Sequence, residues 1–216
     1  MRRRLALPLL PAILAACGAT LLAACGSTPV PVVEGPPIAY GHLTQLRVDA
    51  ASIELDPFTP NAGPNDVGRE LRPNAADAVR VMARDRLAAF GTENVARFQV
   101  VRAQILRTRN APRGGFLAAD AGERLEARLA ARLEIRDQTG RRLGFAEAET
   151  TRSRGAVDST DAARRAAAES LLRQAMFDLN TEFEFQLRRS LRPYLQDGPA
   201  GATPPTPVER EALPPA

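Results

Sequence analysis

The sequence contains no tryptophan and no lysine, and it has one histidine and two cysteines among 216 residues. The histidine, His42, lies just before the first strand-like segment, where we expect a solvated loop residue. A zinc site needs several histidine or cysteine ligands, and the hydrolase motif Gly-x-Ser-x-Gly is missing. We therefore expect no metal site, no cofactor and no catalytic residues, so the protein is not expected to be an enzyme.

The carboxylates do not form a catalytic or calcium-binding pattern either. Asp56, Asp66 and Asp120 fall in expected loops without the spacing of a calcium-binding loop. Glu147 and Glu149 are two residues apart on the solvent side of an expected strand, and acid–base work would require a raised pKa in one of them. We expect these groups to be solvated charges.

The amino terminus has the layout of a secretory signal. Arg2, Arg3 and Arg4 form a cationic start, and residues 5–24 carry no charge. Pro8 and Pro11 interrupt the apolar stretch, which barely reaches the roughly 20 residues of a membrane-spanning helix. Residues 1–24 are therefore predicted to be a cleaved signal peptide.

The sequence Leu22-Ala23-Ala24-Cys25 resembles the lipobox of bacterial lipoproteins. The resemblance implies that Cys25 receives a diacylglycerol and an amine-linked acyl chain such as palmitate, and that it becomes the first residue of the mature protein. A second match ends at Cys17, but cleavage there would leave only a short apolar region, so we expect Cys25 to be the lipidation site.

The remaining charge argues against nucleic-acid binding. Without the three leading arginines, 26 basic side chains face 25 acidic ones, and arginine alternates with glutamate instead of forming a basic stripe. Aspartate, the inner-membrane retention signal of well-studied lipoproteins, is missing after Cys25, where Gly26 and Ser27 follow. We expect an outer-membrane protein facing the periplasm, with the periplasmic face of the inner membrane as the alternative.

Proline and glycine mark the ends of one expected domain. Residues 25–42 are predicted to be an acylated Pro/Gly-rich tether, in a regime where proline-rich chain extends about 3 Å per residue. Residues 196–216 are predicted to be a disordered Pro-rich tail. One periplasmic domain of residues 43–195 lies between them and is long enough for its own core.

Strict alternation over residues 125–135 predicts a strand with leucine, alanine and isoleucine on a buried face and arginine and glutamate on a solvated face. The turn 137–140 and a returning strand to about residue 151 complete a hairpin. Residues 43–55 and 97–108 are also predicted to be strands, and each changes its alternation midway, which a β-bulge would explain.

Two helices are predicted. Asn74 can cap the first, which has a buried stripe from Val79 to Phe90 and ends at Gly91. Asp158 or Ser159 is expected to cap the second, which runs to about Arg192. Its apolar residues recur at steps of three or four: Leu172, Met176, Leu179, Phe183, Leu187 and Leu191.

The order strand, helix, strand, hairpin, long helix predicts an α+β domain, in which two helices pack on one face of a mostly antiparallel four-stranded sheet. Together with the lipobox, this order over residues 43–195 resembles the accessory lipoproteins of lipopolysaccharide and lipid transport. Examples are the lipoprotein plug of the lipopolysaccharide translocon and the auxiliary lipoproteins of ABC-type lipid transporters. No site motif of those families matches, so only Cys25 is carried over.

Two features are candidates for partner contact. Phe116 and Leu117 follow two glycines in an expected loop, where they either fold back on the sheet edge or form an exposed tip. Phe177 and Phe185 lie outside the apolar stripe of the long helix, so either that helix is buried on two sides or the rings form a contact patch.

The function expected from the sequence is that of a membrane-anchored, non-catalytic lipoprotein. It would bind an envelope protein complex or a lipid during envelope assembly or lipid transport. The alternative is a purely structural lipoprotein without a specific cargo.

Overall fold

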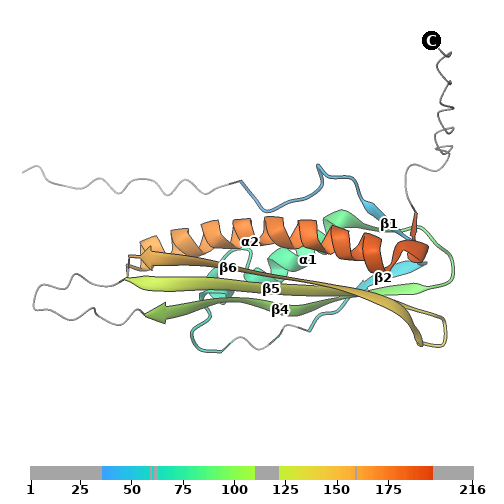
Figure 1. Cartoon of the computed structure of the whole chain (residues 1–216), viewed down its shortest axis with the longest axis horizontal. Coiled ribbons are helices and arrows are strands. Elements are labelled where there is room, and N and C mark those ends of the chain that lie inside the picture. Colours follow the sequence, from blue (N-terminus) through green and yellow to red (C-terminus); the bar gives the residue numbers. More distant parts are fainter. Residues whose placement is uncertain (1–35, 59, 61–62, 110–121, 159, 197–216) are drawn as a thin grey trace, which may run out of the picture. The chain divides into compact units, whose positions relative to one another are not determined.

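The longest strands form a four-stranded sheet in the order β2-β4-β5-β6 (Figure 1). Their bounds are β2 Ser52–Leu55, β4 Val95–Arg109, β5 Glu123–Arg136 and β6 Arg142–Val157. Strand β2 runs parallel to β4, and the other neighbours are antiparallel. The computed structural model describes residues 36–58, 60, 63–109, 122–158 and 160–196. Its main sheet is mostly antiparallel, as the sequence predicts, and contains one parallel pair.

The predicted hairpin of β5 and β6 is confirmed. The inward residues of β5, from Leu125 to Ile135 at every second position, are buried. Gly140 has φ 81° in the turn, a left-handed conformation that glycine adopts without strain. The Asp137 carboxylate accepts hydrogen bonds from the Thr139 and Arg141 backbone N–H groups and so holds the turn closed.

The phase change in β4 is a β-bulge, as predicted. Val100 pairs with Ala131 and Arg102 with Ala130, which leaves Val101 without a place in the ladder. Val101 is exposed, whereas Val100 and Ala103 on either side are buried. One extra residue thus returns the apolar side chains of both halves of the strand to the same face.

The prediction of one bulged strand over residues 43–55 is wrong. The segment forms two strands in two different sheets: β1 (Leu46–Val48) and β2. Strand β1 lies in the centre of a three-stranded sheet, parallel to β3 (Leu87–Ala89) and antiparallel to β7 (Leu195–Gln196). The alternation changes because the chain turns between the two sheets, where the Ala51 N–H donates to the Asn94 carbonyl.

The first helix, α1 (Ala75–Arg86), begins as predicted and ends earlier. The Asn74 side chain accepts a hydrogen bond from the Asp77 N–H, which confirms the cap. The predicted continuation to Gly91 is wrong, because Leu87–Ala89 pairs with β1. Phe90 is therefore 51% exposed instead of buried.

The second helix, α2 (Asp161–Ser190), is capped by Thr160, whose side chain accepts from the Ala163 N–H. The predicted cap at Asp158 is wrong, since this residue lies two positions before Thr160 and its carboxylate accepts from the Thr160 N–H. Ser159, the other predicted cap, lies outside the described residues. The predicted stripe from Leu172 to Leu191 is buried. Thirty residues give a helix of about 45 Å, a length that strands of 14 and 16 residues can match at about 3.3 Å per residue.

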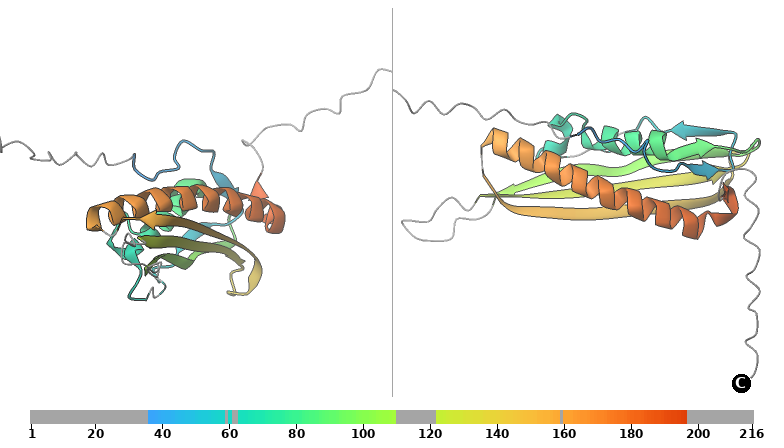
Figure 2. Two further views of the ribbon diagram at one scale, coloured as in Figure 1. Left: turned by 60° about the vertical axis from the view of Figure 1, so that its left-hand side comes forward. Right: turned by 90° about the horizontal axis from the view of Figure 1, so that it is seen from above.

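Both helices pack on the same face of the four-stranded sheet (Figure 2). Phe98 of β4 meets Phe183 of α2 in an edge-to-face contact, with ring centroids 5.7 Å apart. Two short 3-10 helices, η1 (Val67–Glu70) and η2 (Arg192–Tyr194), flank α1 and α2. The predicted α+β fold class is confirmed, with the small three-stranded sheet as an addition.

Candidate functional site

The outer side of α2 carries two exposed aromatic rings. Phe177 is 71% exposed and Phe185 is 53% exposed, whereas Met176, Leu179 and Phe183 on the inner side are buried. The helix is therefore not buried on two sides at these rings. Thr181 lies between them, and its hydroxyl donates to the Phe177 carbonyl at 3.1 Å. We call Phe177, Thr181 and Phe185 the α2 ridge.

Two of the carboxylates next to the α2 ridge are held by arginines. Glu184 accepts hydrogen bonds from Arg86 and, at 3.0 Å, from Arg188. Asp178 accepts from Arg152 of β6, and this bond and the Asp178 charge raise the pKa of Arg152. Glu182, the third carboxylate beside the ridge, accepts from the Gln186 side chain at 2.7 Å. The carboxylates beside the ridge are therefore bonded within the domain.

Arg86 joins α1 to α2. Its side chain is 3% exposed and donates to Asn180 Oδ1 at 3.0 Å, to Glu184, and to the Thr44 carbonyl. A buried guanidinium is stable only when its donors are satisfied. This contact fixes the outward direction of the helix face that bears the ridge.

Tyr40 fastens the chain before β1 to the same helix. Its hydroxyl donates to the Met176 carbonyl at 3.2 Å, and its N–H donates to Asp85 Oδ2 at 2.7 Å. Burial, and then the charge of Asp85, raise the pKa of Tyr40 to about 12. Although the sequence places Tyr40 in the tether, the residue is 8% exposed and packs into the core.

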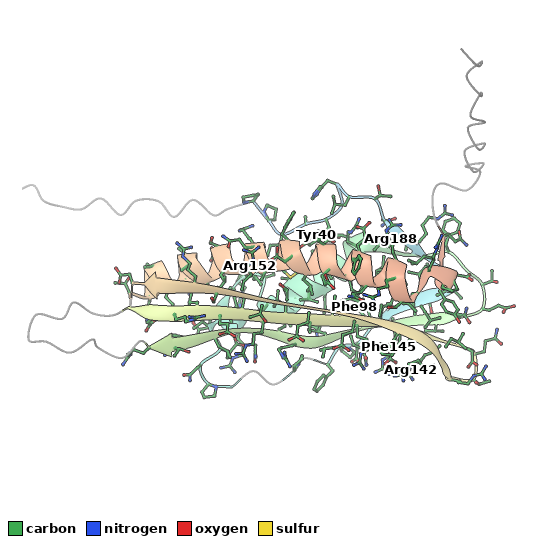
Figure 3. All side chains as sticks on the ribbon, in the orientation of Figure 1. Tyr40, Phe98, Arg142, Phe145, Arg152 and Arg188 are labelled. Carbon is green, nitrogen blue, oxygen red and sulfur yellow. The ribbon has the colours of Figure 1, made fainter. Side chains whose placement is uncertain are left out.

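The face of the four-stranded sheet that points away from the helices carries several arginine–glutamate pairs. Figure 3 labels Arg142 and Phe145 of β6 in this region. Glu147 accepts from Arg132 at 2.5 Å, and Glu149 from Arg102, which reaches across the small Ala130. Glu147 and Glu149 are thus ion-pair partners of arginines on β5 and β4.

Glu134 on this face corrects the expectation that the outward charges of β5 are all solvated. Its side chain is 5% exposed beside Arg132, Arg136 and Arg142. Burial alone would raise the pKa of Glu134, but the hydrogen bond from Arg136 and the three positive charges lower it below its ordinary value. Arg132 and Arg142 also lie over the ring of Phe145, with Cζ 5.4 and 4.9 Å from its centroid.

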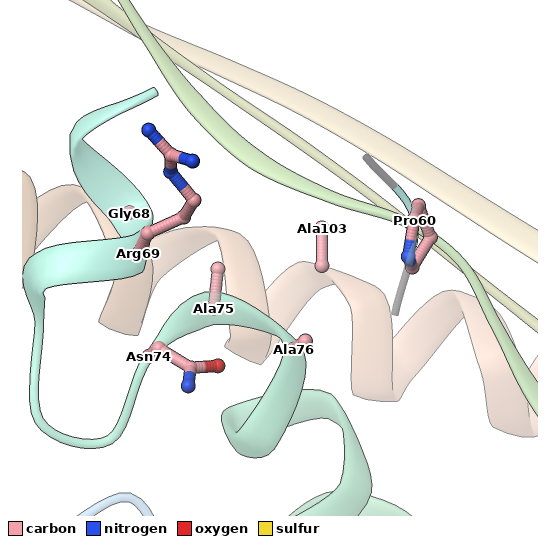
Figure 4. A pocket seen from close by; sticks show the side chains of 7 residues that line it. All are labelled: Pro60, Gly68, Arg69, Asn74, Ala75, Ala76 and Ala103. Carbon is pink, nitrogen blue, oxygen red and sulfur yellow. The ribbon is translucent and has the colours of Figure 1, made fainter. Parts of the chain in front are cut away.

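A small cavity of about 250 Å³ lies between η1, the start of α1 and β4 (Figure 4). Its lining residues are mostly small: Pro60, Gly68, Arg69, Asn74, Ala75, Ala76 and Ala103. The Asn74 side-chain oxygen already accepts from Asp77. The volume is below the roughly 300–1,000 Å³ of typical ligand pockets, so we do not assign a substrate to it.

Asp66 is a buried carboxylate that the sequence places in a loop without a role. Its Oδ1 accepts from the Ile105 N–H at 2.7 Å and from the Gly68 N–H at 2.9 Å. Burial raises the pKa of Asp66 despite these bonds. The residue therefore ties the η1 loop to β4, with a carboxylate that resists ionisation.

The remaining predicted site residues lie elsewhere. Cys25, Phe116 and Leu117 are outside the described residues, and His42 is exposed. Within the described ranges, no group of three or more His, Cys, Asp or Glu side chains could hold a metal ion. Across the same residues, no helix is both long and apolar enough to cross a membrane.

No protein-family model matches the chain, and no curated protein matches it. Solved structures with a similar arrangement include a minor lipoprotein from Acinetobacter baumannii (14% identity, 70% of this chain and 99% of that one, TM-score 0.34). Another is a Xanthomonas campestris protein of family DUF330 (14%, 65% and 85%, TM-score 0.31). A candidate lipoprotein from Caulobacter crescentus is a third (16%, 62% and 85%, TM-score 0.30). At these scores the similarity supports no argument about the function of this chain.

Proposed function

We propose that this chain is a lipid-anchored envelope protein, acylated at Cys25, whose α+β domain is a non-catalytic binding component. The anchor is proposed from the lipobox in the sequence. The observation that supports binding is the α2 ridge: α2 buries Phe183 and exposes Phe177 and Phe185. Exposed aromatic rings in a row are typical of contact surfaces.

The proposed partner is an envelope protein complex or a lipid, and the proposed role is accessory to envelope assembly or lipid transport. The proposed location is the outer membrane, facing the periplasm, because Gly26 and Ser27 follow Cys25. Density-gradient fractionation of envelopes tests this location, and co-migration with inner-membrane markers would contradict it.

The anchor is tested by replacing the acylated residue. The Cys25→Ala variant should remain unprocessed or become soluble, because no other atom in the lipobox offers a thiol for lipid transfer. Mass spectrometry of the mature amino terminus should find a lipid-modified peptide beginning at Cys25. A lipid-modified peptide beginning at Cys17 would move the site, and an unmodified mature protein would refute the anchor.

Binding is tested by affinity capture of the acylated protein from solubilised envelopes, with co-purifying proteins and lipids identified by mass spectrometry. The Phe177→Ala, Phe185→Ala double variant should fail to recover the proteins or lipids that co-purify with the wild type. The matched control is Phe58→Ala, since Phe58 is 67% exposed but belongs to the segment after β2. Equal recovery by the wild type and the double variant would favour the structural alternative.

A further inference from the structure

We propose that the α2 ridge rests on the phospholipid surface to which the chain is anchored, so that α2 is a second, peripheral membrane contact. This inference rests on the proposed lipid anchor and names the partner of the ridge. It starts from the orientation of the two rings. Phe177 and Phe185 are two turns apart, which is about 12 Å along the axis, and their directions differ by about 80°. Both therefore lie within about 40° of Thr181, and one flat surface can touch all three.

The polar groups on the ridge require no outside partner. The Thr181 hydroxyl is bonded to the Phe177 carbonyl, so this side chain can approach an apolar phase without losing a hydrogen bond to water. Glu184 is held by Arg86 and Arg188, and Asp178 is held by Arg152. Helix α2 carries five arginines and five acidic residues, so its net charge neither attracts nor repels an anionic surface.

The point where the chain joins the domain also favours a lipid surface. Tyr40 is fixed to the Met176 carbonyl, and Met176 precedes Phe177 in the sequence. Fourteen residues separate Cys25 from Tyr40, so the anchor can lie no farther than about 50 Å from this point. Linking two contacts in one chain raises the effective concentration of the second contact, to the order of millimolar for a short linker. Two rings that bind weakly on their own are then sufficient to orient the domain.

The absence of tryptophan from the sequence allows a direct test. Three acylated full-length proteins each carry one probe: Phe177→Trp, Phe185→Trp, or the control Phe58→Trp. Each is reconstituted in vesicles of phosphatidylethanolamine with phosphatidylglycerol and, separately, of phosphatidylcholine alone. We expect a blue shift of emission and quenching by brominated phospholipid at positions 177 and 185. At position 58 we expect water-like emission.

Because α2 has no net charge, the emission shift should not depend on the charge of the lipid. The shift should be equal in anionic and zwitterionic vesicles, and it should persist at high salt, because the contact is apolar. Loss of the shift with salt would overturn the apolar contact. In the same proteins, Thr181→Asp places an unpaired carboxylate between the rings and should return both probes to water-like emission.

The remaining outcomes separate the other occupants and the underlying proposal. Water-like emission at 177 and 185 in a protein that stays on the vesicles overturns this inference and leaves the anchor intact. A shift only in native envelope vesicles identifies a protein partner, and a concentration-dependent shift without vesicles identifies a second copy of the chain. Either result overturns the lipid contact. A protein that does not stay on the vesicles refutes the proposed anchor instead.

Discussion

Arg164 Nε donates to Glu123 Oε2 at 2.6 Å and joins the first turns of α2 to the first residue of β5. The Glu123 side chain is 1% exposed, although its place beside the arginine-rich alternation gives no sign of burial. The bond raises the pKa of Arg164. A buried carboxylate is tolerated here because one guanidinium supplies two of its hydrogen bonds.

The Arg164→Met variant should lose about 3–5 kcal/mol of unfolding free energy, because it leaves a buried carboxylate without its main partner. The neighbouring exposed residue gives a matched control, and Arg165→Met should change stability by at most about 0.5 kcal/mol. Adding Glu123→Gln to Arg164→Met should recover part of the loss. Urea unfolding of the four proteins measures these differences, and equal stability of the two arginine variants would contradict a structural pair.

The aromatic residues of α2 should separate into two classes. Phe183→Ala should cost about 3–5 kcal/mol, because it opens a cavity beside Phe98. Phe177→Ala and Phe185→Ala should each change stability by no more than about 0.5 kcal/mol, since both rings are mostly exposed. Thermal unfolding monitored by circular dichroism measures the three variants. A large drop in melting temperature for the exposed pair would show that these rings support the core.

The Tyr40 phenol should ionise at a higher pH than an ordinary tyrosine. Its folded pKa of about 12 lies above its ordinary value of 10.0, so its contribution to stability is complete below about pH 10 and is lost as the pH rises through about 12. Absorbance titration of a Tyr194→Phe protein isolates the Tyr40 phenol, because the chain has two tyrosines. Tyr40→Phe should cost about 0.5–1.5 kcal/mol for one hydrogen bond. Ionisation near pH 10 would contradict the buried contact with Met176.

Asp66 and Asp137 should show opposite pH dependence. The pKa of Asp66 is raised by burial, so the stability linked to its protonated form is present below the ordinary pKa and lost as the pH rises through the raised one. The stability of Asp66→Asn relative to the wild type should therefore increase as the pH rises from acid to neutral. Unfolding free energies measured across that range give the difference.

The contrasting residue is Asp137, whose pKa is lowered first by the Thr139 hydroxyl and then by the bonds from Arg141. Its contribution is present above the ordinary pKa and is lost as the pH falls through the lowered one. The stability of the Asp137→Asn variant relative to the wild type should therefore decrease as the pH rises. A difference of the same sign for both aspartates would refute the burial of Asp66.

Local patterns were sufficient for the long strands β4 to β6 and for the start of α1. The alternation of β5 predicts its buried face, because successive side chains of any strand point to opposite sides. The Asn74 cap and the turn at Gly140 depend on groups within four residues of each other. The bulge in β4 also shows in the sequence, because both halves of the strand pack under the same helices.

The split of residues 43–55 could not be predicted in the same way. A bulge and a turn between two sheets produce the same change of phase, and only the partners distinguish them: β3 and β7 for β1, and β4 for β2. For the same reason, Leu87–Ala89 was predicted to continue α1. Its apolar residues suit either structure, and the parallel pairing with β1 decides between them.

The sequence by itself determined the α+β fold class, the β5–β6 hairpin and the buried stripe of α2. These depend on neighbours along the chain and on the partition of apolar side chains from water. Only the tertiary structure decided which charges are buried and which rings stay exposed. Arg86 bonds to Glu184, which is 98 positions away in the sequence. Tyr40 bonds to Met176, which is 136 positions away. Burial at such sites depends on surfaces that exist only once distant segments have packed, so the direction of the α2 ridge is a property of the fold.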